Sequence, residues 1–197
     1  MSLADDETLR VKPLYELEGQ RFDPVTLRDV VIDHPITGHG DDVPPTRAPA
    51  LQRLAELEEE AVEIRIVISR DQAMRKLFGF ALFSNGAGDG LPIILRPETG
   101  TLRVGTTDAP FAVADLPEDE DVELRIFIDS YLVEVFANDR QAVVAAHLEG
   151  AGGPGLHAFT VGAPTTIKQL DVWKLRPTNQ GFRDARVSQI WKPDVQG

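Results

Sequence analysis

The chain has 197 residues and a formal net charge of −12, which argues against nucleic acid or an anionic membrane as a partner, because both are bound through basic patches. It contains no cysteine, so disulfides and thiolate metal sites are excluded. With 42% hydrophobic residues it can build a substantial core, while the lack of an apolar run of membrane length and of a signal-peptide core leaves the compartment open between cytoplasmic and secreted.

Short β-forming runs broken by Gly, Pro, Asp and Asn follow one another along the chain. About a dozen strands at this spacing, with little helix between them, predict an all-β sandwich of two antiparallel sheets with about six strands each. The predicted strands are residues 8–17, 25–32, 61–69, 77–84, 91–96, 101–106, 111–115, 122–129, 132–138, 142–148, 156–161 and 165–175.

One segment has helical spacing. In "PALQRLAELEEEA" (49–61) apolar residues recur every three to four positions, although the same residues could instead lead directly into the strand at 61–69. The domain boundaries we expect are a disordered or non-native start at 1–8, the sandwich at 9–176 and a tail at 177–197. Phe182, Val187, Ile190 and Trp191 predict that this tail docks somewhere instead of extending freely into solvent.

The most informative stretch is "LRIFIDSYLVEVFAND" (124–139). Alternation predicts a hairpin with a four-residue loop at 129–132 and one register, since a slip of one residue would mix apolar and polar faces. The predicted pairs are Leu124 with Ala137, Ile126 with Val135, and Ile128 with Val133.

A second turn at 138–141 predicts that Val135 pairs with Val144 and Phe136 with Val143. The face of this three-stranded meander that points away from the core is then too apolar to be fully solvated. We expect a partner domain or the chain's own tail to cover it. Its residues are Arg125, Phe127, Glu134, Phe136, Val143 and Ala145.

The stretch "LRIFIDSYLVEVFANDRQAVVAAHL", with "KPLYELEGQR" (12–21) before it and "IKQLDVWKL" (167–175) after it, resembles the C-terminal β-sandwich domain of glycoside hydrolase family 32, the invertase, levanase and fructosidase family. The resemblance spans about residues 9–176. Ser130-Tyr131-Leu132 stands where the family usually has Arg-Ser-Ser, and Arg140 where it usually has Gly, which marks an outlying member. The fold expected is therefore an all-β, concanavalin- or lectin-like sandwich.

The resemblance implies that catalysis sits on a separate five-bladed propeller, N-terminal to the sandwich, in Asn-Asp-Pro-Asn-Gly, Arg-Asp-Pro and Glu-Cys motifs. Here the only Asn-Asp is Asn138-Asp139, followed by Arg140, and no Arg-Asp precedes Pro. Without cysteine there is no Glu-Cys. We therefore expect a sandwich cut from a larger hydrolase of sucrose or fructan-type substrates, without activity of its own.

The leading hypothesis is thus an accessory domain that packs against the propeller of the parent chain and takes part in structure and in sugar binding. The alternatives are a free-standing carbohydrate-binding module and an interaction domain that uses the Phe127, Phe136 and Val143 face. Carbohydrate and a second copy of the chain are further candidate partners. No cofactor is expected.

We expect no catalytic residue. Asp129 and Glu134 could approach across the hairpin as a glycosidase pair, but a turn carboxylate beside a strand carboxylate is the commoner arrangement, with Glu134 pairing to Arg125 or to a missing domain. Trp173 is predicted to serve packing rather than a sugar platform. The candidate sugar or partner contacts are Tyr131 at the hairpin tip, Glu134, Phe127, Phe136 and Arg125.

No metal site is expected either. The weak candidates are His34, His39 and Asp41, whose residue types suit divalent ions. Their spacing matches no metal-binding motif, and they lie in a Pro-rich loop.

Overall fold

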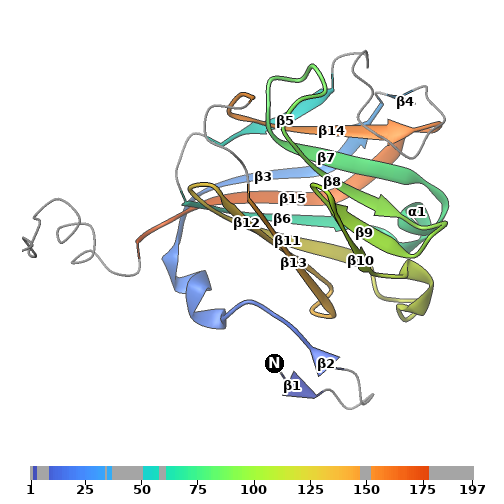
Figure 1. Cartoon of the computed structure of the whole chain (residues 1–197), viewed down its shortest axis with the longest axis horizontal. Coiled ribbons are helices and arrows are strands. Elements are labelled where there is room, and N and C mark those ends of the chain that lie inside the picture. Colours follow the sequence, from blue (N-terminus) through green and yellow to red (C-terminus); the bar gives the residue numbers. More distant parts are fainter. Residues whose placement is uncertain are drawn as a thin grey trace, which may run out of the picture.

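A computed structural model describes residues 2–3, 9–33, 35–36, 51–57, 61–146 and 152–177. Two twisted sheets lie face to face (Figure 1). One sheet has the order β13 (Gln141–Ala146), β12 (Leu132–Ala137), β11 (Val122–Asp129), β6 (Ala61–Ile68), β15 (Thr165–Leu175) and β3 (Arg21–Ile32). The other has the order β10 (Thr107–Pro110), β9 (Thr101–Val104), β8 (Leu91–Arg96), β7 (Leu77–Ser84), β14 (Gly155–Val161) and β4 (Pro35–Ile36), with β5 (Gln52–Glu56) also paired to β14.

The predicted all-β sandwich is therefore confirmed. Strand pairs are antiparallel except β4 with β14, which are parallel. The remaining elements are short: β1 (Ser2–Leu3), β2 (Leu9–Arg10), the 3₁₀ turns η1 (Tyr15–Gln20) and η2 (Val113–Asp115), and the helix α1 (Arg70–Arg75). Over the described ranges, no helix has the length and apolarity needed to cross a membrane.

The core fills the space between the two sheets. In β11 the alternate residues Leu124, Ile126 and Ile128 are buried there, as the period of two requires. β7, β8 and β14 are buried on both faces, since Phe80 belongs to the main core while its neighbour Ala81 packs in a second cluster with Leu51, Ile94 and Phe159. Burial on both faces explains why these strands read as continuous apolar runs rather than as alternating ones.

Three local expectations are wrong. Residues 49–61 contain the strand β5 instead of a helix, because pairing with β14 decides the conformation over the leucine spacing. Most of 8–17 is irregular or 3₁₀ rather than strand, and 111–115 holds η2 while the strand of this region is β10. The helix α1 was not predicted, although Ser69 at its start is a recognisable cap: its side chain accepts a hydrogen bond from the Gln72 N–H.

The first predicted hairpin register is confirmed: Leu124 pairs with Ala137, Ile126 with Val135 and Ile128 with Val133. The loop is tighter than predicted. Asp129 pairs with Leu132, which leaves Ser130, at φ 55°, and Tyr131 as a two-residue turn.

The second hairpin register is wrong by one residue. Asn138 and Asp139 both adopt left-handed φ angles, 47° and 54°, and the Arg140 N–H donates to the Ala137 carbonyl at 2.9 Å. The loop therefore has three residues, and Phe136 pairs with Ala142. Because one step reverses the faces of a strand, Val143 is buried in the core and Val144 points outward.

His157 on β14 makes stability depend on pH. Its ring is 5% exposed, its Nδ1 has no hydrogen-bond partner in the described part of the chain, and burial lowers its pKa below the ordinary value of 6.5. As pH falls below about 6.5, the unfolded chain binds a proton at His157 that the folded chain does not bind. Protonation therefore favours the unfolded state, and the free energy of unfolding decreases.

We therefore expect His157→Gln to flatten the decline of unfolding free energy between neutral pH and pH 5, measured by urea unfolding at each pH. The comparison with the unchanged chain removes the contribution of the carboxylates common to both. Parallel pH profiles for the two proteins would contradict the prediction.

Candidate functional site

The predicted contact residues gather on the outer face of the six-stranded sheet, the face turned away from the other sheet. Phe127 lies opposite Glu134, and Arg125 opposite Phe136, on β11 and β12. The rings of Phe127 and Phe136 meet edge to face at 5.9 Å, and the Arg125 guanidinium lies 5.4 Å from the Phe127 ring centroid. Tyr131 is 56% exposed at the hairpin tip. Their roles as contacts remain predictions.

Part of this face is covered by the chain itself. Residues 11–20, which we call the strap, run along it from the β12–β13 turn to the start of β3 (Figure 1). The Val11 N–H donates to the Asp139 carbonyl at 2.7 Å, and the Arg176 N–H to the Gln20 carbonyl at 3.0 Å. The segment before the sandwich, rather than the tail, thus supplies the described cover; residues 178–197 lie outside the described ranges.

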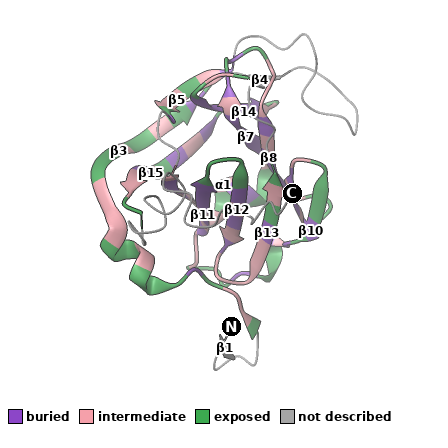
Figure 2. Ribbon diagram, turned by 60° about the vertical axis from the view of Figure 1, so that its left-hand side comes forward, coloured by how far each residue is buried: buried purple, intermediate pink, exposed green. Residues whose placement is uncertain are grey.

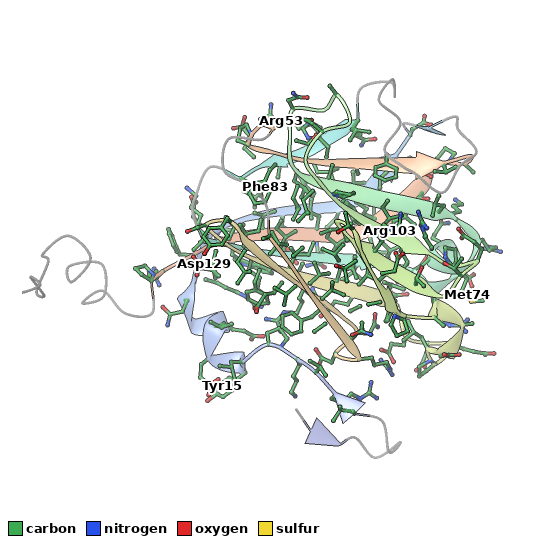
Figure 3. All side chains as sticks on the ribbon, viewed as in Figure 1. Tyr15, Arg53, Met74, Phe83, Arg103 and Asp129 are labelled. Atoms are coloured by element: carbon green, nitrogen blue, oxygen red, sulfur yellow. The ribbon has the colours of Figure 1, made fainter. Side chains whose placement is uncertain are left out.

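Two neighbouring apolar side chains of the strap are exposed, beside the exposed polar residues Lys12, Glu16 and Glu18. Leu14 is 70% exposed and Tyr15 77% exposed. Figure 2 shows the strap and β3 mainly as exposed or intermediate, in contrast to the buried strands β7 and β14. Figure 3 places Tyr15 on the strap beneath the sandwich, and Asp129 at the end of β11.

Glu63 of β6 is the centre of the outer face. It is fully buried and accepts hydrogen bonds from two arginines of other strands: Arg21 of β3 donates through Nε at 2.8 Å and Nη2 at 2.7 Å, and Arg125 of β11 through Nε at 3.0 Å and Nη2 at 2.8 Å. Hydrogen bonding to Glu63 raises the pKa of Arg21 above its ordinary value, so this arginine stays charged. The same guanidinium lies 4.3 Å from the centroid of the Trp173 ring.

The suggested pairing of Glu134 with Arg125 is therefore wrong, since Arg125 binds Glu63. Within the described residues, Glu134 has neither an ion pair nor a hydrogen-bonded side-chain partner, although it is only half exposed. Sequence reasoning missed Glu63. The available signal was its position in "AVEIRIVI", where Glu63 and Arg65 stand alone in an otherwise apolar run.

A second ion-pair set lies beside the first. Arg65 binds one carboxylate oxygen of Glu123 through Nε at 2.8 Å and Nη2 at 2.5 Å. Asp171, which is 3% exposed, accepts hydrogen bonds from Thr26 at 2.7 Å and Gln169 at 2.6 Å, and lies 3.6 Å from Arg65.

Between these sets the surface is hollowed into an open groove of about 430 Å³. Side chains of the four strands β3, β6, β11 and β15 line it, together with Glu18 of the strap. The lining residues are Glu18, Arg21, Arg65, Glu123, Arg125, Gln169, Asp171 and Trp173. Trp173 thus forms part of the groove wall under Arg21.

The suggested catalytic pair is not part of this groove. Asp129 is exposed beside the turn, where it lies 3.5 Å from the Ser130 hydroxyl, and neither Asp129 nor Glu134 lines the hollow. The metal candidates His34, His39 and Asp41 lie outside the described residues. In the ranges that are described, no three His, Asp or Glu side chains are placed to hold a metal ion together.

The two packed sheets define a β-sandwich domain. Comparison with protein families shows which family this domain belongs to. Residues 38–174 match the family described as "Glycosyl hydrolases family 32 C terminal", and the chain belongs to this family. This confirms the resemblance seen in the sequence.

Solved structures of similar fold are larger enzymes. The chain is similar to sucrose-6-phosphate hydrolase from Lactobacillus gasseri, with 16% identity and a TM-score of 0.59 over 88% of this chain and 32% of that one. It is similar to exo-inulinase from Aspergillus awamori, with 13% identity and a TM-score of 0.58 over 87% and 33%. It is also similar to fructan 1-exohydrolase IIa from Cichorium intybus, with 11% identity and a TM-score of 0.55 over 84% of this chain and 37% of that one.

At these identities the structures establish the fold alone. The chain spans about a third of the length of these enzymes. A comparison with curated proteins gave no match.

Proposed function

We propose that the chain is the accessory β-sandwich of an enzyme that hydrolyses O-glycosidic bonds in sucrose or fructan-type substrates, and that it packs against the catalytic propeller. Family membership supports the proposal, as do the sucrose- and fructan-directed names of the similar structures. The sequence contains none of the three catalytic motifs of the family, so the reaction itself falls to the propeller.

The observation that carries the packing proposal is a set of exposed apolar side chains on the strap and on the neighbouring hairpin strands. Leu14 and Tyr15 lie on the strap between Val11, bonded to the β12–β13 turn, and Glu18, 3.6 Å from Arg125. Further exposed apolar side chains on this side are Leu9, Tyr131, Leu132 and Val144. Exposed apolar side chains gathered on one part of a surface often mark a protein interface.

Glu134 adds a charge preference to this surface. It lies opposite Val144 on β13 and two residues from Leu132 on β12, so its half-buried carboxylate has apolar neighbours. A partner that supplies a guanidinium or ammonium group there would pair a carboxylate that has no ion pair within the described residues. We therefore expect a basic side chain of the propeller to lie against Glu134.

The test is association with the propeller domain from the same source, produced as a separate chain and measured by titration calorimetry. The double variant Leu14→Ser/Tyr15→Ser is expected to weaken binding by at least about tenfold, because each apolar side chain contributes roughly 1.5–3 kcal/mol when fully buried. The melting temperature of the sandwich should not change, since both side chains are already exposed.

The matched control is Val25→Ser/Val31→Ser on β3, where two valines are 50% and 52% exposed on the free edge of the sheet. This pair should leave binding unchanged. Equal weakening by both pairs, or no association at all, would contradict the proposed interface. Release of fructose from sucrose, inulin or levan by the sandwich alone would contradict the assignment of the reaction to the propeller.

A further inference from the structure

The groove on the outer face of the six-stranded sheet has a composition that neither propeller packing nor family membership explains. Its groups are almost balanced in charge: Arg21, Arg65 and Arg125 oppose Glu18, Glu123 and Asp171, with Glu63 buried beneath. An anionic ligand would meet the carboxylates and a cationic ligand the guanidinium groups. The charge pattern therefore favours a neutral ligand.

Several polar groups of the groove are left without a hydrogen bond inside the described part of the chain. Arg21 and Arg125 each bind Glu63 through Nε and Nη2, which leaves both Nη1 groups as donors. Glu123 uses only Oε2 toward Arg65, so its Oε1 is an acceptor. The half-exposed Glu18 carboxylate is a second acceptor, at 3.6 Å from its nearest arginines.

Donors and acceptors thus stand side by side around one hollow. A hydroxyl group both donates and accepts, and adjacent hydroxyls can satisfy such a mixed set, whereas a carbonyl only accepts and an ammonium group only donates. The volume of about 430 Å³ falls in the range of roughly 300–1,000 Å³ that is usual for small-molecule sites. We infer that the groove binds a neutral polyhydroxylated ligand, a sugar or a sugar alcohol.

The groups are held in place before a ligand arrives. Glu63 fixes the two guanidinium groups through four N–H bonds, so little side-chain freedom remains to be lost on binding. Trp173 lies under Arg21, and no acceptor in the described ranges binds its indole N–H. Trp173 therefore contributes one wall that carries this N–H group, and Arg21 lies over a face of its ring.

The inference is tested on the complete chain by ¹⁵N NMR titration with sucrose, a fructo-oligosaccharide and sorbitol, and with phosphate and spermidine as charged probes. The neutral ligands are expected to shift amide signals of β6, β11 and β15 around the groove. The charged probes should shift them less at equal concentration. Binding of the sugars without sorbitol would assign the site to ring sugars, and equal binding would assign it to polyols in general; either supports the inference.

Two variants each remove one hydrogen-bonding group from the groove. Glu123→Ala and Trp173→Phe should each weaken sugar binding roughly two- to tenfold, the effect of one hydrogen bond. Asp108→Ala is the control, because Asp108 is half-exposed and paired with Arg103 on the other sheet, at 2.7 Å. It should leave binding unchanged.

The inference is overturned if no neutral ligand shifts the groove signals, if phosphate or spermidine binds better than the sugars, or if the groove variants bind as the unchanged chain does. The inference is also overturned if Asp108→Ala weakens sugar binding as much as Glu123→Ala does. The measurement uses the sandwich without a propeller, so its failure leaves the packing proposal untouched, and failure of packing leaves this inference untouched.

Discussion

Replacing Glu63 by alanine is expected to lower the free energy of unfolding by about 3–5 kcal/mol, the usual cost of removing one partner from a buried charge pair. Glu63 is fully buried and accepts four N–H bonds from Arg21 and Arg125. Without it, the guanidinium groups of Arg21 and Arg125, whose side chains are 19% and 13% exposed, keep only the half-exposed Glu18 carboxylate, 3.6 Å from each. Urea unfolding followed by far-ultraviolet circular dichroism measures the change.

Two companion variants show whether the unpaired charge is the cause. The triple variant Glu63→Leu, Arg21→Met and Arg125→Met replaces the whole buried set by apolar side chains, and we expect it to be more stable than Glu63→Ala. Asp108→Ala, which removes a surface ion pair, should cost less than about 1 kcal/mol. A cost for Glu63→Ala no greater than that of Asp108→Ala would refute the central place given to this residue.

A second large effect is expected from Phe80→Ala, about 3–5 kcal/mol of unfolding free energy. Phe80 is fully buried between the sheets and meets Phe78 edge to face, with 6.1 Å between ring centroids. Truncation removes apolar surface from the core and leaves a cavity that the two packed sheets cannot readily close.

The measurement is again urea unfolding, with the dependence on urea concentration unchanged, because the same surface is exposed when the chain unfolds. Val25→Ala on the exposed edge strand serves as the control and should change stability by no more than about 0.5 kcal/mol. A similar decrease in the free energy of unfolding for both variants would show that Phe80 does not lie in a well-packed core.

The hairpin at 122–137 could be predicted from sequence because its determinants are local. Leu124, Ile126 and Ile128 must share a face with their partners on β12, and only one register allows that. The register of the next hairpin depends on contacts with an earlier part of the chain. The Asn138 side chain accepts a hydrogen bond from the Glu123 N–H at 3.0 Å and donates to the Asp121 carbonyl at 2.7 Å, which holds the three-residue loop.

The same distinction applies to the site. The alternation of side chains along the strands predicts that Arg125, Phe127, Glu134 and Phe136 share one face, and the structure shows them on one face. Glu63 could not be chosen as their centre, because its neighbours follow from the strand order β11-β6-β15-β3, which pairs it with Trp173, 110 positions later in the chain. The leucine spacing at 49–61 wrongly predicted a helix for a related reason. The segment forms the strand β5, whose partner β14 lies about 100 residues later.

The central claim is that the strap and the β12–β13 strands form the surface that a catalytic propeller covers. Hydrogen–deuterium exchange of the sandwich, alone and with the propeller from the same source, tests it most directly. Addition of the propeller is expected to slow exchange in residues 9–20 and 129–146 and to leave β8, β9 and β10 unchanged. Slower exchange confined to β8–β10, or no difference anywhere, would contradict it.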